Sequence, residues 1–71
     1  MLLTMLPPGK EAKIIASKAN DSTKKFLEAL GIIPGVTISV VSERKGNLIV
    51  NVKGSRLALN RGTAHQLFVQ V

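Results

Sequence analysis

Hydrophobic and polar residues alternate with a period of two along most of the chain. Five short segments show this alternation, and clusters of Gly, Asn and Ser separate them. Their apolar positions are Ala12, Ile14 and Ala16; Val36, Ile38 and Val40; Leu48, Val50 and Val52; Leu57 and Leu59; and Leu67, Val69 and Val71. A period of two places such side chains on one face of a strand. The pattern predicts a mainly β fold, a small barrel of about five strands.

Two Pro-Gly steps stand before the first two of these segments, at Gly9 and at Pro34-Gly35. Proline sets φ for the second position of a turn, and glycine tolerates positive φ at the third. We therefore expect a type II turn at each step. The segments 36–42 and 48–53 predict a hairpin across "ERKGN", with Gly46 and Asn47 near its tip.

One helical pattern interrupts the strands and predicts an α-helix over about 22–30. Asp21 or Ser22 can cap its first turn with a side-chain oxygen. Gly31 can adopt the left-handed conformation that ends a helix, and Ile32 would then pack against Leu27. The apolar face of this helix is expected to consist of Thr23, Phe26, Leu27 and Leu30. A second, short helical turn over about 61–66 is expected, capped by Asn60.

The chain has 71 residues, which predicts a single domain over 1–71. It has no cysteine, so disulfides and thiolate metal clusters are excluded, and a cytoplasmic location is favoured. No segment approaches the ~18 apolar residues of a membrane-spanning helix. The opening "MLLTMLPPG" lacks the basic residues of a signal peptide.

The formal net charge is +6, which is compatible with a nucleic-acid-binding surface. Two features argue against that partner. The cations are spread along the chain, with pairs only at Lys24-Lys25 and Arg44-Lys45. The chain also has two Phe and no Trp or Tyr, which gives little material for stacking bases.

Side chains that could carry catalysis are few, so we expect a protein that is not an enzyme. The four acidic residues stand on four different predicted elements, and no Gly-rich phosphate loop is present. His65 is the single histidine and the only, weak, candidate for a metal ligand, because no HxxxH spacing or cysteine accompanies it.

Apolar residues on the outer phase of the strands are the remaining candidates for function. In a barrel, Ile15, Val41, Ile49 and Phe68 would face outward. The simpler expectation is that the helix and the N-terminal "MLLTML" cover them. Residues left uncovered would form an apolar patch of the kind that marks partner sites. Ile32 and Ile33, in a loop beside a turn, join this group.

Three segments of the sequence resemble the FeoA family, the small ferrous iron transport protein A. Leu3–Gly9 resembles the family's "LxxLxPG" opening, and Leu27–Gly35, "LEALGIIPG", resembles its "LxxLGIxPG" signature. Val52–Leu59 and Ala64–Val69 resemble its closing strands. Together they cover nearly the whole chain in the order of the family.

The resemblance implies an SH3-like β-barrel with a helix inserted after the first long strand. It implies a cytoplasmic accessory protein that contacts a large membrane ferrous iron transporter with its own GTP-binding domain. Similar domains occur in iron-dependent repressors, which implies an association with transition metals such as Fe(II).

Three functions follow as hypotheses. The first is an adaptor that binds the transporter through the helix end and the next loop, with Leu30, Ile32 and Ile33 at the centre and Lys24 and Lys25 at the rim. The second is a transition-metal sensor that uses His65 and nearby acids. The third is a basic nucleic-acid module, whose binding would weaken steeply with salt.

Overall fold

The alternating segments form one antiparallel sheet in the computed structural model, which describes residues 1–71. The strands are β1 (Glu11–Ser17), β2 (Thr37–Arg44), β3 (Asn47–Val52), β4 (Ser55–Asn60) and β5 (Leu67–Gln70). Their order in the sheet is β4-β3-β2-β1-β5. The helical elements are the 3-10 turn η1 (Leu3–Met5) and the α-helices α1 (Asp21–Ala29) and α2 (Arg61–Ala64). The predicted mainly β fold with five strands and an inserted helix is confirmed.

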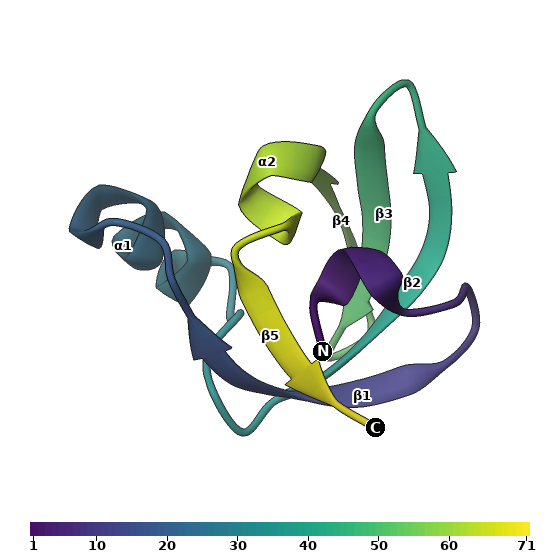
Figure 1. The fold of residues 1–71 in the computed structure, drawn as a ribbon, viewed down its shortest axis with the longest axis horizontal. Coiled ribbons are helices and arrows are strands. Elements are labelled where there is room, and N and C mark those ends of the chain that lie inside the picture. Colours follow the sequence, from purple (N-terminus) through teal and green to yellow (C-terminus); the bar gives the residue numbers. More distant parts are fainter.

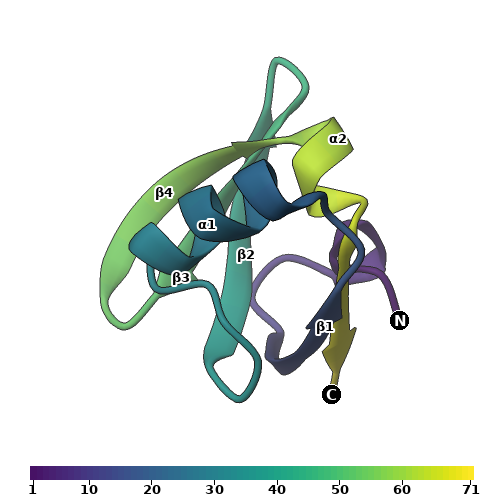
Figure 2. The same ribbon diagram turned by 90° about the vertical axis from the view of Figure 1, so that its left-hand side faces the viewer.

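The sheet is strongly bent, and the helices lie at its open sides (Figure 1). α1 extends across the side between β4 and β1 (Figure 2). β4 and β5 are the two edge strands, so no hydrogen bonds between them close the barrel. α2 connects these edges, and its Asn60 cap is confirmed, because the Asn60 side chain accepts a hydrogen bond of 2.8 Å from the Thr63 amide.

Both predicted type II turns are present. Gly9 and Gly35 have φ values of +85° and +94°, in the left-handed region that favours glycine. In each turn the amide of the last residue donates to the carbonyl of the first, from Lys10 to Pro7 and from Val36 to Ile33, both at 3.2 Å. These turns therefore start the two longest strands.

The hairpins β2–β3 and β3–β4 have two-residue turns in which both residues have positive φ. Lys45 and Gly46 have values of 51° and 81°, and Lys53 and Gly54 have values of 53° and 81°. This conformation matches the right-handed twist of the flanking strands. The first tip lies one residue earlier than predicted, because Asn47 already pairs with Arg44 in the sheet.

Sixteen buried residues form a single core, and all of them are hydrophobic. They are Leu3, Leu6, Ala12, Ile14, Ala19, Leu27, Ile32, Ile38, Val40, Leu48, Val50, Val52, Leu59, Ala64, Leu67 and Val69. No polar or charged residue is buried. Every ionisable side chain therefore lies at or near the surface.

Two β-bulges change which side chains of β1 and β2 face the core, compared with the predicted alternation. The register shifts between Ile14 and Ala16 where β1 pairs with β5, and Ala16 is exposed instead of lying in the core as predicted. A second shift falls between Val40 and Ser42. Each bulge inserts an extra residue, so the side chains beyond it no longer follow the alternation.

The outward apolar residues are only partly covered. Ile15 and Val41 are 47% and 36% exposed, whereas Ile49 and Phe68 are half-buried. Part of the expected cover is present, because Leu2 forms an isolated bridge with Phe68. The helix and the N-terminal segment therefore cover the outward apolar residues incompletely, and an apolar surface remains exposed beside β1 and β5.

Candidate functional site

The start of α1 is fixed by Asn20. Its side-chain oxygen accepts a hydrogen bond of 2.9 Å from the amide of Thr23. The prediction of Asp21 or Ser22 as the cap is wrong by one or two residues, because all three side chains can cap and only the backbone geometry decides among them. Asp21 instead lies in the first turn, where a negative charge favours the helix dipole.

The end of α1 is a Schellman motif, as predicted for Gly31. Gly31 has a φ of +85°, its amide donates to Glu28, and the Ile32 amide donates to Leu27, both at 2.9 Å. The motif turns the Ile32 side chain into the core, where it is 3% exposed. The expectation that Ile32 is an exposed loop residue is therefore wrong, whereas Ile33 is 38% exposed.

Only a narrow stripe of α1 faces the sheet. Leu27 is buried, and Thr23 and Leu30 are half-buried at the positions one helical turn to either side. Phe26 was predicted on this face but is 56% exposed. It lies at the margin of the stripe, because Leu27 is the residue of α1 that enters the core and Leu30 packs against that core.

A groove of about 410 Å³, here called the α1 groove, lies between this helix and the loop that follows it. Leu27 and Ile32 supply buried apolar surface, and Ile33 and Pro34 form one wall. The lining residues are Ser17, Lys24, Leu27, Glu28, Ile32, Ile33 and Pro34. The site thus has an apolar centre with charged side chains beside it.

The structure brings together only some of the predicted contact residues. Lys24, Ile32 and Ile33 line the α1 groove, whereas Lys25 and Leu30 do not. Of the other lining residues, Leu27 was predicted only for the helix face and Pro34 only for a turn, and Ser17 and Glu28 were missed. The i, i+4 spacing from Lys24 could have indicated Glu28, since residues four apart share a helix face. Nothing in the sequence places Ser17, at the end of β1, beside the helix.

A second groove, of about 460 Å³, lies where the ends of β1, β2 and β5 meet. Its lining is more polar and consists of Glu11, Ala12, Lys13, Thr37, Gln70 and Val71. It has no buried apolar floor comparable to Leu27 and Ile32. The α1 groove is therefore the better candidate for binding a protein partner, because protein interfaces have an apolar core.

His65 does not form part of a metal centre within the chain. Its Nδ1 lies 3.2 Å from the hydroxyl oxygen of Thr4, and no three His, Cys, Asp or Glu side chains gather anywhere in the structure. Transition-metal sites in proteins use at least three such ligands in most cases. The residues of a single chain therefore do not fit a transition-metal site.

The only ion pair joins Arg61 and Glu43, between α2 and β2. Both side chains are more than half exposed, at 55% and 56%. Exposed pairs of this kind contribute little to stability and carry no chemistry by themselves. Glu43 is one of the four acidic residues of the chain, and in this pair its charge is neutralised by Arg61.

The fold and the comparisons agree on the class of protein. A bent five-stranded sheet with a helix between its first two strands is an SH3-like domain. The sequence model of the FeoA domain matches residues 1–71, and the chain therefore belongs to the FeoA family. A comparison with curated proteins found no match. Neither α-helix has the length and apolar character that crossing a bilayer requires.

Solved structures of the same fold include several FeoA proteins. FeoA from Chlorobium tepidum is 25% identical and has a TM-score of 0.93, covering 100% of this chain and 70% of its own. FeoA from Stenotrophomonas maltophilia, solved with zinc, is 28% identical, with a TM-score of 0.84 and coverage of 99% and 89%.

The chain also matches part of IdeR from T. acidophilum. The identity is 29% and the TM-score is 0.90, over 100% of this chain and 33% of IdeR. The predicted similarity to a domain of metal-dependent repressors is confirmed. IdeR is about three times longer than the matched region, so the match concerns this domain alone.

Proposed function

We propose that this protein is an accessory factor of ferrous iron uptake that acts by binding the GTP-binding part of the membrane ferrous iron transporter. The observation that carries the proposal is membership of the FeoA family over the whole chain. The relative from Stenotrophomonas maltophilia has been described as a candidate activating factor of ferrous iron transport. A binding role also agrees with a core that buries no polar side chain.

The α1 groove is the proposed contact site. Its apolar floor and its Lys24 and Glu28 rim follow the usual anatomy of a protein interface, with an apolar core and a polar rim. Ile33 is the most useful residue to test, because it lines the groove and is 38% exposed. A carboxylate in place of this side chain would have to lose its hydration when the partner covers the groove, which opposes binding.

The test is affinity purification of the tagged chain from detergent-solubilised membranes of its own cells, with nuclease and physiological salt. The expected result is recovery of a membrane transporter that contains a GTP-binding domain. Recovery of only ribosomal and nucleic-acid-linked proteins would overturn the proposal.

Two pairs of variants then locate the contact. Ile33→Asp should abolish recovery, whereas Val41→Asp, at a residue of matched exposure on β2, should retain it. Lys24→Glu with Lys25→Glu should weaken recovery, and Lys45→Glu with Lys53→Glu, at the two hairpin tips, is the control with the same change of net charge. If the Ile33→Asp variant still recovers the transporter, the transporter is the partner but its contact lies outside the α1 groove.

A further inference from the structure

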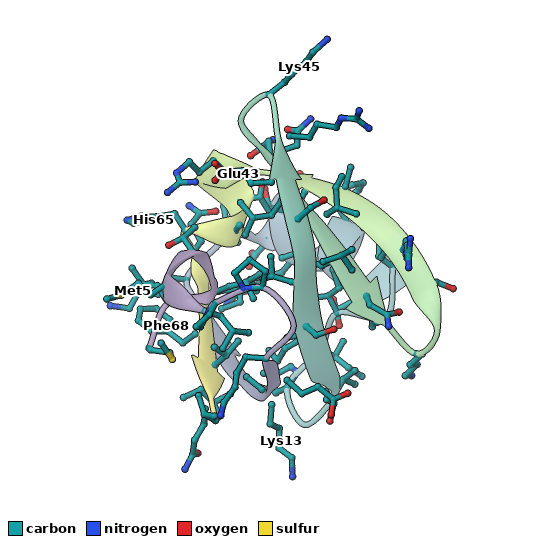
Figure 3. The ribbon with its side chains drawn as sticks, turned by 90° about the vertical axis from the view of Figure 1, so that its right-hand side faces the viewer. Met5, Lys13, Glu43, Lys45, His65 and Phe68 are labelled. Atoms are coloured by element: carbon teal, nitrogen blue, oxygen red, sulfur yellow. The ribbon has the colours of Figure 1, made fainter.

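A second surface with both apolar and basic character lies away from the α1 groove. It consists of Met5 on η1, Ile15 on β1, Lys18 directly after β1, and Phe68 on β5, and we call it the η1–β5 face. Figure 3 shows Met5 and Phe68 on the same side of the molecule, opposite β4. Met5 and Ile15 are 65% and 47% exposed, and Phe68 is half-buried.

The bulge in β1 adds Ala16 to the outer side of the sheet. Ala16 pairs with Phe68 and is exposed, and Ile15, which already stands on the outward phase of β1, is exposed beside that pair. On the other side of β5, Leu2 bridges to Phe68, and η1 follows directly with Met5. Three separate elements therefore bring apolar side chains to one face.

The charge on this face has a single sign. The segments that form it, Leu3–Met5, Ile15–Lys18 and Leu67–Gln70, contain one lysine and no acidic residue. The Lys18 ammonium lies 5.2 Å from the centre of the Phe68 ring, so the cation and the ring are presented together. The net charge of the whole chain, Lys18 included, is +6, which also favours an anionic surface.

The shape of this face differs from that of a peptide-binding groove. The two grooves described above lie elsewhere, and their linings include none of Met5, Ile15, Lys18 and Phe68. The exposed apolar side chains instead come from three separate elements, η1, β1 and β5. Projecting apolar side chains with a neighbouring cation suit a bilayer interface, where the former enter the headgroup region and the latter contacts anionic lipids.

We propose that the η1–β5 face binds the surface of membranes that contain anionic lipids. Met5, Ile15 and Phe68 enter the headgroup region, and Lys18 contacts lipid phosphate groups. The proposal does not depend on the transporter, because lipid alone is the ligand. It goes beyond the adaptor function by giving the protein a membrane contact of its own.

Tryptophan fluorescence tests the proposal directly, since the chain has no Trp. Met5→Trp places a single reporter on the face, and Phe26→Trp places the matched control on α1 at a residue of similar exposure. Each variant is mixed with protein-free vesicles of phosphatidylcholine, with or without phosphatidylglycerol. The expected result is a blue shift of the emission of the Met5→Trp variant only with phosphatidylglycerol, and no shift for the Phe26→Trp variant.

A charge reversal distinguishes binding through this face from a general electrostatic attraction of the basic protein to anionic vesicles. Lys18→Glu in the Met5→Trp background should weaken vesicle binding on the order of tenfold or more, since each lysine near an anionic surface contributes about a factor of five. Lys45→Glu changes the net charge equally but lies on the tip of the β2–β3 hairpin (Figure 3). It should weaken binding much less, because salt screens charges beyond about 8 Å.

Four outcomes would overturn the proposal. They are no emission shift with phosphatidylglycerol vesicles, equal shifts at positions 5 and 26, equal losses from Lys18→Glu and Lys45→Glu, and a shift that grows with protein concentration without vesicles. The last would show that a second copy covers the face. Because the vesicles contain no transporter, failure here leaves the adaptor function standing, and failure of the purification leaves the lipid result standing.

Discussion

The backbone amide of Ile32 donates a hydrogen bond of 2.9 Å to the carbonyl oxygen of Leu27. Both side chains are buried, at 3% and 1% exposure, and both line the α1 groove. The end of the helix and the floor of the groove are therefore the same structure. A substitution that loosens this helix stop should change stability and the groove together.

Gly31→Ala should lower the free energy of unfolding by about 1–2 kcal/mol, because an L-residue is strained in the left-handed conformation. The new Cβ would meet no heavy atom within 4 Å, so the strain is in the backbone and not in packing. Urea denaturation measures the change. Gly62→Ala is the control, since Gly62 lies in α2 without a positive φ, and it should be neutral or stabilise by up to about 1 kcal/mol. Equal effects of the two substitutions would contradict this account of the helix stop.

Ile32→Ala and Ile33→Ala should differ strongly, although the two residues are neighbours. Ile32 is in the core, so its truncation should cost about 2–4 kcal/mol. Ile33 is 38% exposed, and its truncation should cost roughly 1 kcal/mol or less. Chemical denaturation of both variants provides the comparison. If Ile32→Ala does not fold, Ile32→Val, with an expected cost of about 0.5–1.5 kcal/mol, replaces it. Similar costs at both positions would show that Ile32 is not buried.

Asn20→Ala should destabilise the protein by about 1 kcal/mol, because the Thr23 amide loses its capping oxygen. Asp21→Ala should cost only about 0.3 kcal/mol, through its charge at the helix start, and added salt should reduce that cost. Thermal unfolding at low and high salt distinguishes the two effects. A larger loss from Asp21→Ala would assign the cap to Asp21 after all.

The ion pair between Glu43 and Arg61 should contribute little. A double-mutant cycle with Glu43→Gln and Arg61→Gln should give a coupling energy of about 0.2–1 kcal/mol, because both side chains are more than half exposed. High salt should reduce it further. A coupling energy that is large and independent of salt would indicate that this pair organises the packing of α2 against β2.

Local signals explain why most of the fold was predictable. The strands and turns follow from period-two alternation and from Pro-Gly steps, which act within a few residues. The cap of α2 was predictable because Asn60 has no competing neighbour. In α1, by contrast, Asn20, Asp21 and Ser22 are all suitable caps, and the sequence does not choose among them.

Long-range relationships explain what was missed. A bulge depends on the register of two strands, so the exposure of Ala16 could not be derived from the β1 segment alone. The 3-10 turn η1 was not predicted, because three residues give too short a pattern. For the candidate site, Lys24, Ile32 and Ile33 were found from sequence, but Ser17 was missed because only the tertiary fold brings it to the helix.

Both hairpin tips place a lysine in the left-handed conformation, with φ values of 51° at Lys45 and 53° at Lys53. Asparagine adopts this conformation more readily at that position of a two-residue turn. Asparagine at both tips would therefore favour the turns, but it would lower the net charge from +6 to +4, that is, 6 − 2. Lys45 points outward from its tip (Figure 3). The two hairpins thus give up turn stability and gain two positive charges at the periphery, which add to the electrostatic repulsion between copies of the protein.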